Sequence, residues 1–79
     1  MIIRNNQDLG EAIRRARKRQ GLRQVDVATR ASVRQAWVSE LETGATRAKL
    51  DTVIKLLAAL ELDLAIVPRR KAELDPTEY

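Results

Sequence analysis

Residues 21–44, GLRQVDVATRASVRQAWVSELETG, contain two short helical patterns joined by a sharp corner. The first pattern covers Gln24–Ala31 and the second covers Gln35–Glu42, and each repeats apolar residues at about 3.6 residues per turn. The corner, Ala31–Arg34, is too short for anything but a tight turn, which Val33 fills. The inward-facing residues are Val27, Ala28, Ala31, Val38 and Leu41. Two helices packed steeply across such a turn form a helix-turn-helix, whose second helix presents hydrogen-bonding side chains that the major groove of DNA accepts.

The composition describes one small globular domain. The 79 residues supply a modest core that association between copies would help to stabilise, and the 44% hydrophobic content excludes a disordered chain. The sequence has no apolar run long enough for a membrane span, and its opening MIIRNNQD does not have the pattern of a signal peptide. We therefore expect a cytoplasmic protein.

Charge is distributed unevenly along the chain. Residues 1–71 carry all 15 Lys and Arg against eight acidic residues, a net charge of +7, whereas residues 72–79 carry a net charge of −3. A basic body with an acidic end suits a polyanionic partner for the body and a different role for the tail. A merely soluble surface explains the basic body equally well.

The chain contains no histidine and no cysteine. It therefore lacks the usual general base near neutral pH and both of the soft metal ligands. A domain of this size also leaves little room for a cleft that excludes water. The composition argues against an enzyme and excludes a disulfide scaffold, and we expect no cofactor and no metal ion.

The N-terminal segments are an arm and a helix. Residues 1–7 are predicted to form an arm or a short strand, because two isoleucines precede a turn-like Asn-Asn pair. The next helix begins with Asp8 or Asn6 as its N-cap and ends near Gln20, before Gly21. Its outer face is basic, and we interpret these cations as mainly solvated, although one edge could approach a phosphate.

The C-terminal segments are a helix, a strand and a tail. Leu50–Leu60 is strongly helical, and its inward stripe is predicted to be Leu50, Val53, Ile54, Leu57 and Leu60. Leu56 widens this stripe sideways, which indicates a packed neighbour. Residues 62–68 alternate in hydrophobicity, as a strand with one covered face does. Such a strand must pair with Ile2–Arg4, with the same strand of a second copy, or with both. The predicted dimerisation residues are Leu56, Leu62, Leu64, Ile66 and Val67.

These segments together predict an all-α domain. Residues 8–61 would form the DNA-binding bundle of four to five helices, with 1–7 as the arm, 62–68 as the dimerisation strand and 69–79 as a flexible acidic tail.

The start of the second helix of the motif carries the candidate base contacts, which are Arg34, Gln35, Ala36, Trp37 and Ser39. The amide of Gln35 can pair with adenine N6 and N7, and Arg34 can reach guanine or a phosphate. Ala36 suits a thymine methyl group, and Ser39 is small enough for a base or a phosphate. Trp37 has two interpretations, packing against the first helix or apolar contact with DNA. Glu40 is interpreted as solvated rather than as an acceptor from cytosine.

The candidate phosphate contacts are Arg23, Gln24, Arg47 and Lys49. Gln24 lies in a first helical turn, where free N–H groups and the helix dipole favour an anion, and an ordinary helix start is the alternative interpretation. Arg23 and Arg34 each precede a helix, where a residue with an acceptor side chain would stabilise the helix by about 0.5–2 kcal/mol. Two such departures in one motif, both in favour of a cation, indicate a function, although solvated arginines remain the alternative.

The run L-x-Q-x-x-V-A-x-x-x-S-V-R-Q-A-W-V-S-x-L-E-T-G resembles the XRE-type (lambda-repressor-like, Cro/C1) helix-turn-helix family over about residues 8–62. The positions in register are Gln24, Ala28, Val33, Ser39, Glu42 and Gly44. Ser32 and Arg34 depart from the usual Gly and Ser, and a left-handed Ser32 would cost about 1 kcal/mol. The resemblance implies a lambda-repressor-like fold and an ion pair between Arg17 and Glu42.

The ends of the chain narrow this resemblance. The opening I-I-R-x-x-x-D-L-G-x-A-I-R, the position of Trp37 and the ending L-A-A-L-E-L-D-L-A-I-V-P look like the HipB-type antitoxins. This resemblance implies a homodimer with paired C-terminal strands and a palindromic operator as its DNA partner. It also implies repression of its own operon and a HipA-like serine/threonine kinase toxin as its protein partner. The acidic tail with Tyr79 would then dock on a basic partner, or it is simply a frayed end.

Two other functions stay open from the sequence. One is a stand-alone transcription regulator without a toxin, which the neighbouring gene would distinguish. The other is a protein-interaction module on the same fold, against which the outward cations argue.

Overall fold

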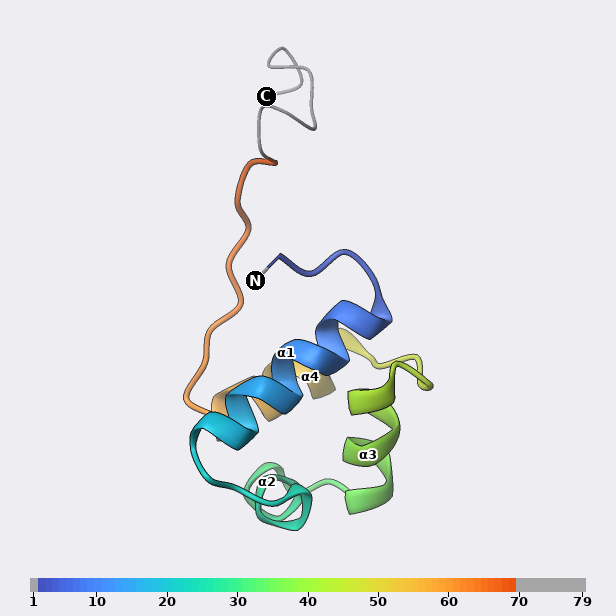
Figure 1. Ribbon diagram of the computed structural model, residues 1–79, viewed down its shortest axis with the longest axis vertical. Coiled ribbons are helices and arrows are strands. Elements are labelled where there is room, and N and C mark those ends of the chain that lie inside the picture. The colour runs from blue at the N-terminus through green and yellow to red at the C-terminus, as the bar shows by residue number, and fades with distance from the viewer. Residues whose placement is uncertain (1, 70–79) are drawn as a thin grey trace.

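The computed structural model describes residues 2–69, and four helices form its body (Figure 1). Their bounds are α1 Asn6–Arg19, α2 Gln24–Ala31, α3 Gln35–Thr43 and α4 Leu50–Ala59. Helix α3 packs against α1 and α2, and α2 also packs against α4. The N-terminal arm lies at the end of the molecule away from α2, and the segment after α4 begins beside the end of α1 and runs toward that arm (Figure 1). The predicted all-α fold is confirmed, with four helices in the described residues.

One contiguous core holds the four helices together. Its buried residues are Ile13, Val27, Ala28, Ala31, Val38, Leu41, Val53, Leu56, Leu57 and Leu60. All five residues that the motif pattern placed inward are among them. A close approach of α1 to α3 completes this packing at Gly10, where an added Cβ would meet the carbonyl oxygen of Leu41 and lie 2.8 Å from that of Glu42.

Helix α1 begins earlier than the sequence indicated. Its N-cap is Asn5, whose side-chain oxygen accepts the N–H of Asp8 at 2.7 Å, so the prediction of Asp8 or Asn6 as the cap is wrong. Asp8 instead accepts the N–H of Arg4 at 3.1 Å with its carboxylate. The two side chains thus satisfy donors on both sides of the first turn, which starts the helix at Asn6, before either of the starts that the two predicted caps imply.

The corner of the motif keeps a left-handed residue although it has no glycine. Ser32 has φ 55° and ψ 45°, the conformation that glycine adopts without cost. Its backbone N–H donates to the carbonyl of Thr29 at 3.2 Å, and Val33 donates to Ala28 at 3.0 Å. Ser32 therefore adopts the left-handed conformation itself, and these two hydrogen bonds close the turn.

The apolar face of α4 is rotated from the one predicted. Leu50 is 62% exposed and Ile54 is 48% exposed, whereas Leu56 has no exposed surface. The assignment of Leu56 to a dimer interface is therefore wrong, because its side chain is buried within one chain. The helix is apolar on more than one face, so its spacing alone did not decide which stripe turns inward.

The segment after α4 leaves the body in an extended path. A hydrogen bond from Gln20 Nε2 to the carbonyl of Leu60 at 2.8 Å fixes the end of α4 to the end of α1. Residues 62–69 are exposed and form no strand pairing within the described chain. A strand over 62–68 needs a partner, so it stays a prediction for an assembly of two chains. The predicted tail lies outside the described residues except for its first residue, and Tyr79 lies outside them as well.

Candidate nucleic-acid interface

Helix α3 turns three of the five candidate base contacts to solvent. Arg34, Gln35 and Ala36 are exposed, whereas Trp37 and Ser39 are half-buried. Arg34 is the N-cap of α3 and makes no capping hydrogen bond with its side chain, as expected for a residue without an acceptor. Trp37 packs partly against the core. The first turn of α3 is therefore open to a partner on one side and supported on the other.

A buried ion pair anchors the opposite side of α3, and it is the pair that the family resemblance implies. Arg17 Nε donates to Glu42 Oε2 at 2.7 Å, and Nη2 donates to Oε1 at 2.9 Å. The third nitrogen of the guanidinium donates to the carbonyl of Leu22 at 2.8 Å. Hydrogen bonding to Glu42 raises the pKa of Arg17 against the opposing effect of burial. One residue of α1 therefore fixes both α3 and the loop that leads into α2.

Gln24 takes part in the same network. Its amide nitrogen Nε2 donates to Glu42 Oε1 at 3.2 Å, and the residue is half-buried. The sequence favoured a phosphate contact here over an ordinary helix start, and it did not show this link between α2 and α3. An amide nitrogen carries two hydrogens, so the contact with a phosphate stays a prediction beside the structural role.

Arg23, at the start of α2, is paired within the protein. Its Nη2 lies 3.0 Å from Asp26 Oδ1, and its backbone N–H donates to Asp26 Oδ2 at 2.8 Å. The side-chain hydrogen bond raises the pKa of Arg23 and lowers the pKa of Asp26. The carboxylate thus partly neutralises this candidate phosphate contact and also satisfies a free donor at the helix start.

Four of the candidate contacts come together in one hollow. It lies between the start of α3, the loop after α3 and the first turn of α4, and we call it the α3–α4 hollow. Its lining residues are Val33, Arg34, Trp37, Thr46, Arg47, Lys49 and Thr52. The structure therefore joins Arg34 and Trp37, predicted as base contacts, to Arg47 and Lys49, predicted as phosphate contacts.

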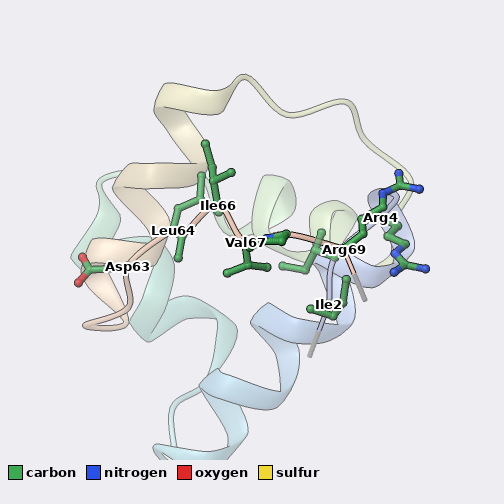
Figure 2. A pocket seen from close by; sticks show the side chains of 10 residues that line it. Ile2, Arg4, Asp63, Leu64, Ile66, Val67 and Arg69 are labelled. Atoms are coloured by element: carbon green, nitrogen blue, oxygen red, sulfur yellow. The ribbon is translucent and has the colours of Figure 1, made fainter. Parts of the chain in front are cut away.

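Four of the five predicted dimerisation residues are exposed, and they are Leu62, Leu64, Ile66 and Val67. Leu64, Ile66 and Val67 line a second hollow together with the N-terminal arm. Figure 2 shows the side chains of Leu64, Ile66 and Val67 following one another along the segment, with Asp63 at one end of the hollow and Ile2, Arg4 and Arg69 toward the other. This places apolar surface from both ends of the described chain on one side of the molecule.

Some residues of these surfaces gave no clear signal in the sequence. Thr46 and Thr52 line the α3–α4 hollow, and only their position beside the basic loop pointed to them. Gly10 carried a usable signal, because glycine inside a helical pattern costs about 1 kcal/mol relative to alanine and so indicates a close packing contact.

Residues 2–69 hold no group of three or more His, Cys, Asp or Glu that could bind a metal ion. Among the helices of this part of the chain, none combines the length and the apolar character that a membrane crossing requires.

Residues 8–69 match the model of the helix-turn-helix domain family. An uncharacterized HTH-type transcriptional regulator from Haemophilus influenzae is 38% identical over 55 residues, which are 70% of this chain and 56% of that protein. The chain therefore spans little more than half the length of this relative.

Solved structures show the same fold. HipB in a complex described as HipB-O4 20mer superimposes with a TM-score of 0.80 and 26% identity, over 89% of this chain and 99% of the other. A HipA-HipB-O2-O3 complex matches with a TM-score of 0.79 at the same identity and the same coverage. The restriction-modification controller protein C.AhdI from Aeromonas hydrophila matches with a TM-score of 0.72 and 26% identity, over 73% of this chain and 88% of that protein.

The family match is consistent with the structure, in which the Arg17–Glu42 ion pair is buried and the first turn of α3 is exposed. The chain belongs to the helix-turn-helix domain family, in the XRE-type form that its sequence resembles.

Proposed function

We propose that this chain is a cytoplasmic transcription regulator that binds duplex DNA through the first turn of α3. The observation that carries this proposal is the exposed row Arg34, Gln35 and Ala36 on a helix anchored from behind by a buried ion pair. A helix held in this way presents its side chains to the major groove without having to order itself on binding.

Gln35 is proposed as the main base reader. Its side chain is exposed at the first position of α3, and an amide both donates and accepts, as the edge of adenine requires. Phosphate contacts from the basic surface would supply most of the affinity, and Gln35 most of the sequence preference.

The experiment that tests this role compares Gln35→Ala with the wild-type chain on a set of operator variants. We expect the variant to lose about 1–3 kcal/mol of discrimination at one base pair and little on unrelated duplexes. Glu40→Ala, an exposed position on the same helix, serves as the control. An equal loss on every duplex would remove Gln35 from the readers.

The functional unit is proposed to be a homodimer on a palindromic operator. Leu62, Leu64, Ile66 and Val67 form an alternating, exposed apolar segment, and Ile66 is fully exposed in the single chain. Pairing of this segment with a second copy would satisfy its backbone groups and cover its apolar surface. Two α3 helices would then enter half-sites about 34–36 Å apart, or a multiple of that spacing.

We further propose that the protein is an antitoxin that represses its own operon and neutralises a HipA-like kinase toxin. The support is the similarity to HipB, including HipB in a complex with HipA, over 89% of this chain. Deletion of residues 72–79 is expected to weaken binding to the toxin and to leave DNA binding intact. Unchanged toxin binding by the shortened chain would remove the tail from the interface.

A stand-alone regulator without a toxin is the second candidate. The similarity to a protein named as an HTH-type transcriptional regulator supports it. Co-expression with the product of the adjacent gene discriminates between the two. A stable complex with a kinase-like protein supports the antitoxin, and its absence supports the stand-alone regulator.

A further inference from the structure

One face of α4 carries apolar residues that the core does not use. Leu50 is 62% exposed, Ile54 is 48% exposed, and Ala58 is exposed as well. These residues lie four apart, so their side chains form one continuous stripe along the helix. The core takes a different stripe of α4 and its C-cap, made of Val53, Leu56, Leu57 and Leu60. The packing of the single chain therefore does not account for the outer apolar stripe.

Two opposite charges flank this stripe. Asp51 and Lys55 are exposed and also lie four residues apart, a spacing that suits an ion pair within a helix. Neither of them forms an ion pair in residues 2–69. Asp51 Oδ1 instead accepts the backbone N–H of Thr52 at 2.7 Å. The flank thus presents an acidic group and then a basic group, in chain order, beside an apolar surface.

The proposed homodimer needs more surface than the segment after α4 supplies. A stable interface takes about 20–30 residues and about 800 Å² from each partner, whereas the proposed pairing segment 62–68 has only seven residues. A pair of strands without further packing is only marginally stable. Helix α4 directly precedes this segment, so its outer stripe is the apolar surface closest in sequence that can extend the interface.

We propose that α4 packs antiparallel against the α4 of a second copy, about a two-fold axis that passes beside Ile54. The proposal rests on the homodimer proposed above. In this arrangement Ile54 contacts the partner subunit's Ile54. Leu50, four residues before the axis, contacts the partner subunit's Ala58, four residues after it. A large side chain then meets a small one at both ends of the contact, which lets the two helices approach closely.

The flanking charges select this occupant and this direction. A two-fold axis between antiparallel helices keeps the same flank of both helices on one side. Asp51 therefore lies beside the partner subunit's Lys55, and Lys55 lies beside the partner subunit's Asp51. Parallel helices would instead place like charges side by side. A second copy thus supplies both the apolar cover and the two opposite charges, in the order that this face requires.

The first test measures the dissociation constant of the full-length dimer by sedimentation equilibrium. Ile54→Glu is expected to raise this constant by about a hundredfold or more, because two like charges would be buried side by side at the axis. Val25→Glu is the matched control, since Val25 is a β-branched residue on α2 that is 38% exposed. Both positions are exposed in the single chain, so circular dichroism is expected to show both variants folded. Equal dissociation constants for the two folded variants would overturn the pairing of α4.

The second test exchanges the charges between chains. Asp51→Lys gives a chain with two cations on the flank, and Lys55→Asp gives a chain with two carboxylates. Each variant alone is expected to dimerise about tenfold more weakly than the wild type, since like charges replace two ion pairs. An equimolar mixture is expected to recover the wild-type dissociation constant as a heterodimer. An effect confined to the single helix would not be rescued by mixing, and absence of rescue would therefore contradict the antiparallel contact.

Ile66→Glu separates this contact from the proposed strand pairing, because Ile66 is fully exposed in the single chain. A dimer weakened by Ile66→Glu and untouched by Ile54→Glu would overturn the role of α4 and leave the proposed homodimer standing. A wild-type chain that stays monomeric at all concentrations would refute the homodimer itself. Unchanged self-association of Ile54→Glu, with loss of binding to the product of the adjacent gene, would assign this face to that protein and overturn the proposal.

Discussion

The two faces of α3, a helix of nine residues, differ in their exposure to solvent. The inner face is closed, because Val38, Leu41 and Glu42 are buried against the core and against Arg17. The outer face at the first turn is open, because Arg34 is exposed and makes no ion pair in the described part of the chain. The difference shows that one short helix can be held rigidly by its buried side while the side chains on its other side stay available to a partner.

The same contrast appears between the two arginine N-caps. Arg23 and Arg34 look equivalent in the sequence, since each precedes a helix that it cannot cap with its side chain. Asp26 lies three residues after Arg23 and pairs with it, whereas the residue three after Arg34 is Trp37. The first arginine is thus held near its own helix, and the second remains available to a partner.

The largest expected loss of stability follows from removing the ion pair on the buried face of α3. Glu42→Gln leaves the guanidinium of Arg17 buried without an opposing charge, and we expect a loss of about 3–5 kcal/mol in the free energy of unfolding. The shift of the urea midpoint at constant slope measures this loss. Glu40→Gln, on the exposed side of the same helix, is the control and is expected to change stability by less than about 0.5 kcal/mol. Similar losses at the two positions would contradict the distinction between the faces.

The next largest loss is expected where α1 lies closest to the buried face of α3. Gly10→Ala would push a methyl group into the backbone carbonyls of α3, and we expect a cost of about 2–3 kcal/mol. Gly21→Ala is the matched control, because its Cβ meets no atom within 4 Å and only its φ of +71° is unfavourable. That control is expected to cost about 1 kcal/mol. Thermal unfolding of both variants ranks them, and the reverse order would show that α1 does not press on α3.

The smallest effect concerns the paired arginine. The pKa of Asp26 is lowered in the folded chain, mainly by the hydrogen bond from Arg23. The ionised carboxylate therefore stabilises the folded state at pH values above the ordinary pKa of 3.8. This stabilisation is lost as the pH falls through the lower folded pKa. We expect Asp26→Asn to be slightly less stable than the wild type at pH 7, and the difference to disappear at strongly acidic pH.

The control for this pair is a double-mutant cycle. Arg23→Gln removes the same interaction from the other side, and the double variant should lose no more than either single variant. A stability difference between the wild type and Asp26→Asn that persists unchanged at low pH would rule out the ion pair as its cause.

Much of the fold could be predicted because it depends on local patterns. The spacing of Val27, Ala28 and Ala31 fixed the inner side of α2, and Val38 and Leu41 fixed that of α3. The resemblance added the Arg17–Glu42 pair, which joins positions 25 residues apart and which no local rule could have revealed.

The misplaced residues all lie where the local pattern had more than one solution. The rotation of α4 exchanged Leu56 for Leu50 and Ile54, since any of these leucines and isoleucines could have filled the core. The bond from Gln24 to Glu42 depends on how closely α2 and α3 approach, and the spacing of residues within α2 carries no information on that distance.

The amino-acid sequence by itself determined the helices, the corner between α2 and α3 and the choice of side chains that α3 offers, because periodicity and turn length are properties of neighbouring residues. Only the tertiary structure decided which cations stay unpaired and that residues 33–37 and 46–52 line one hollow. Such groupings arise from the angles at which helices cross, and those angles are set by the packing of the whole core.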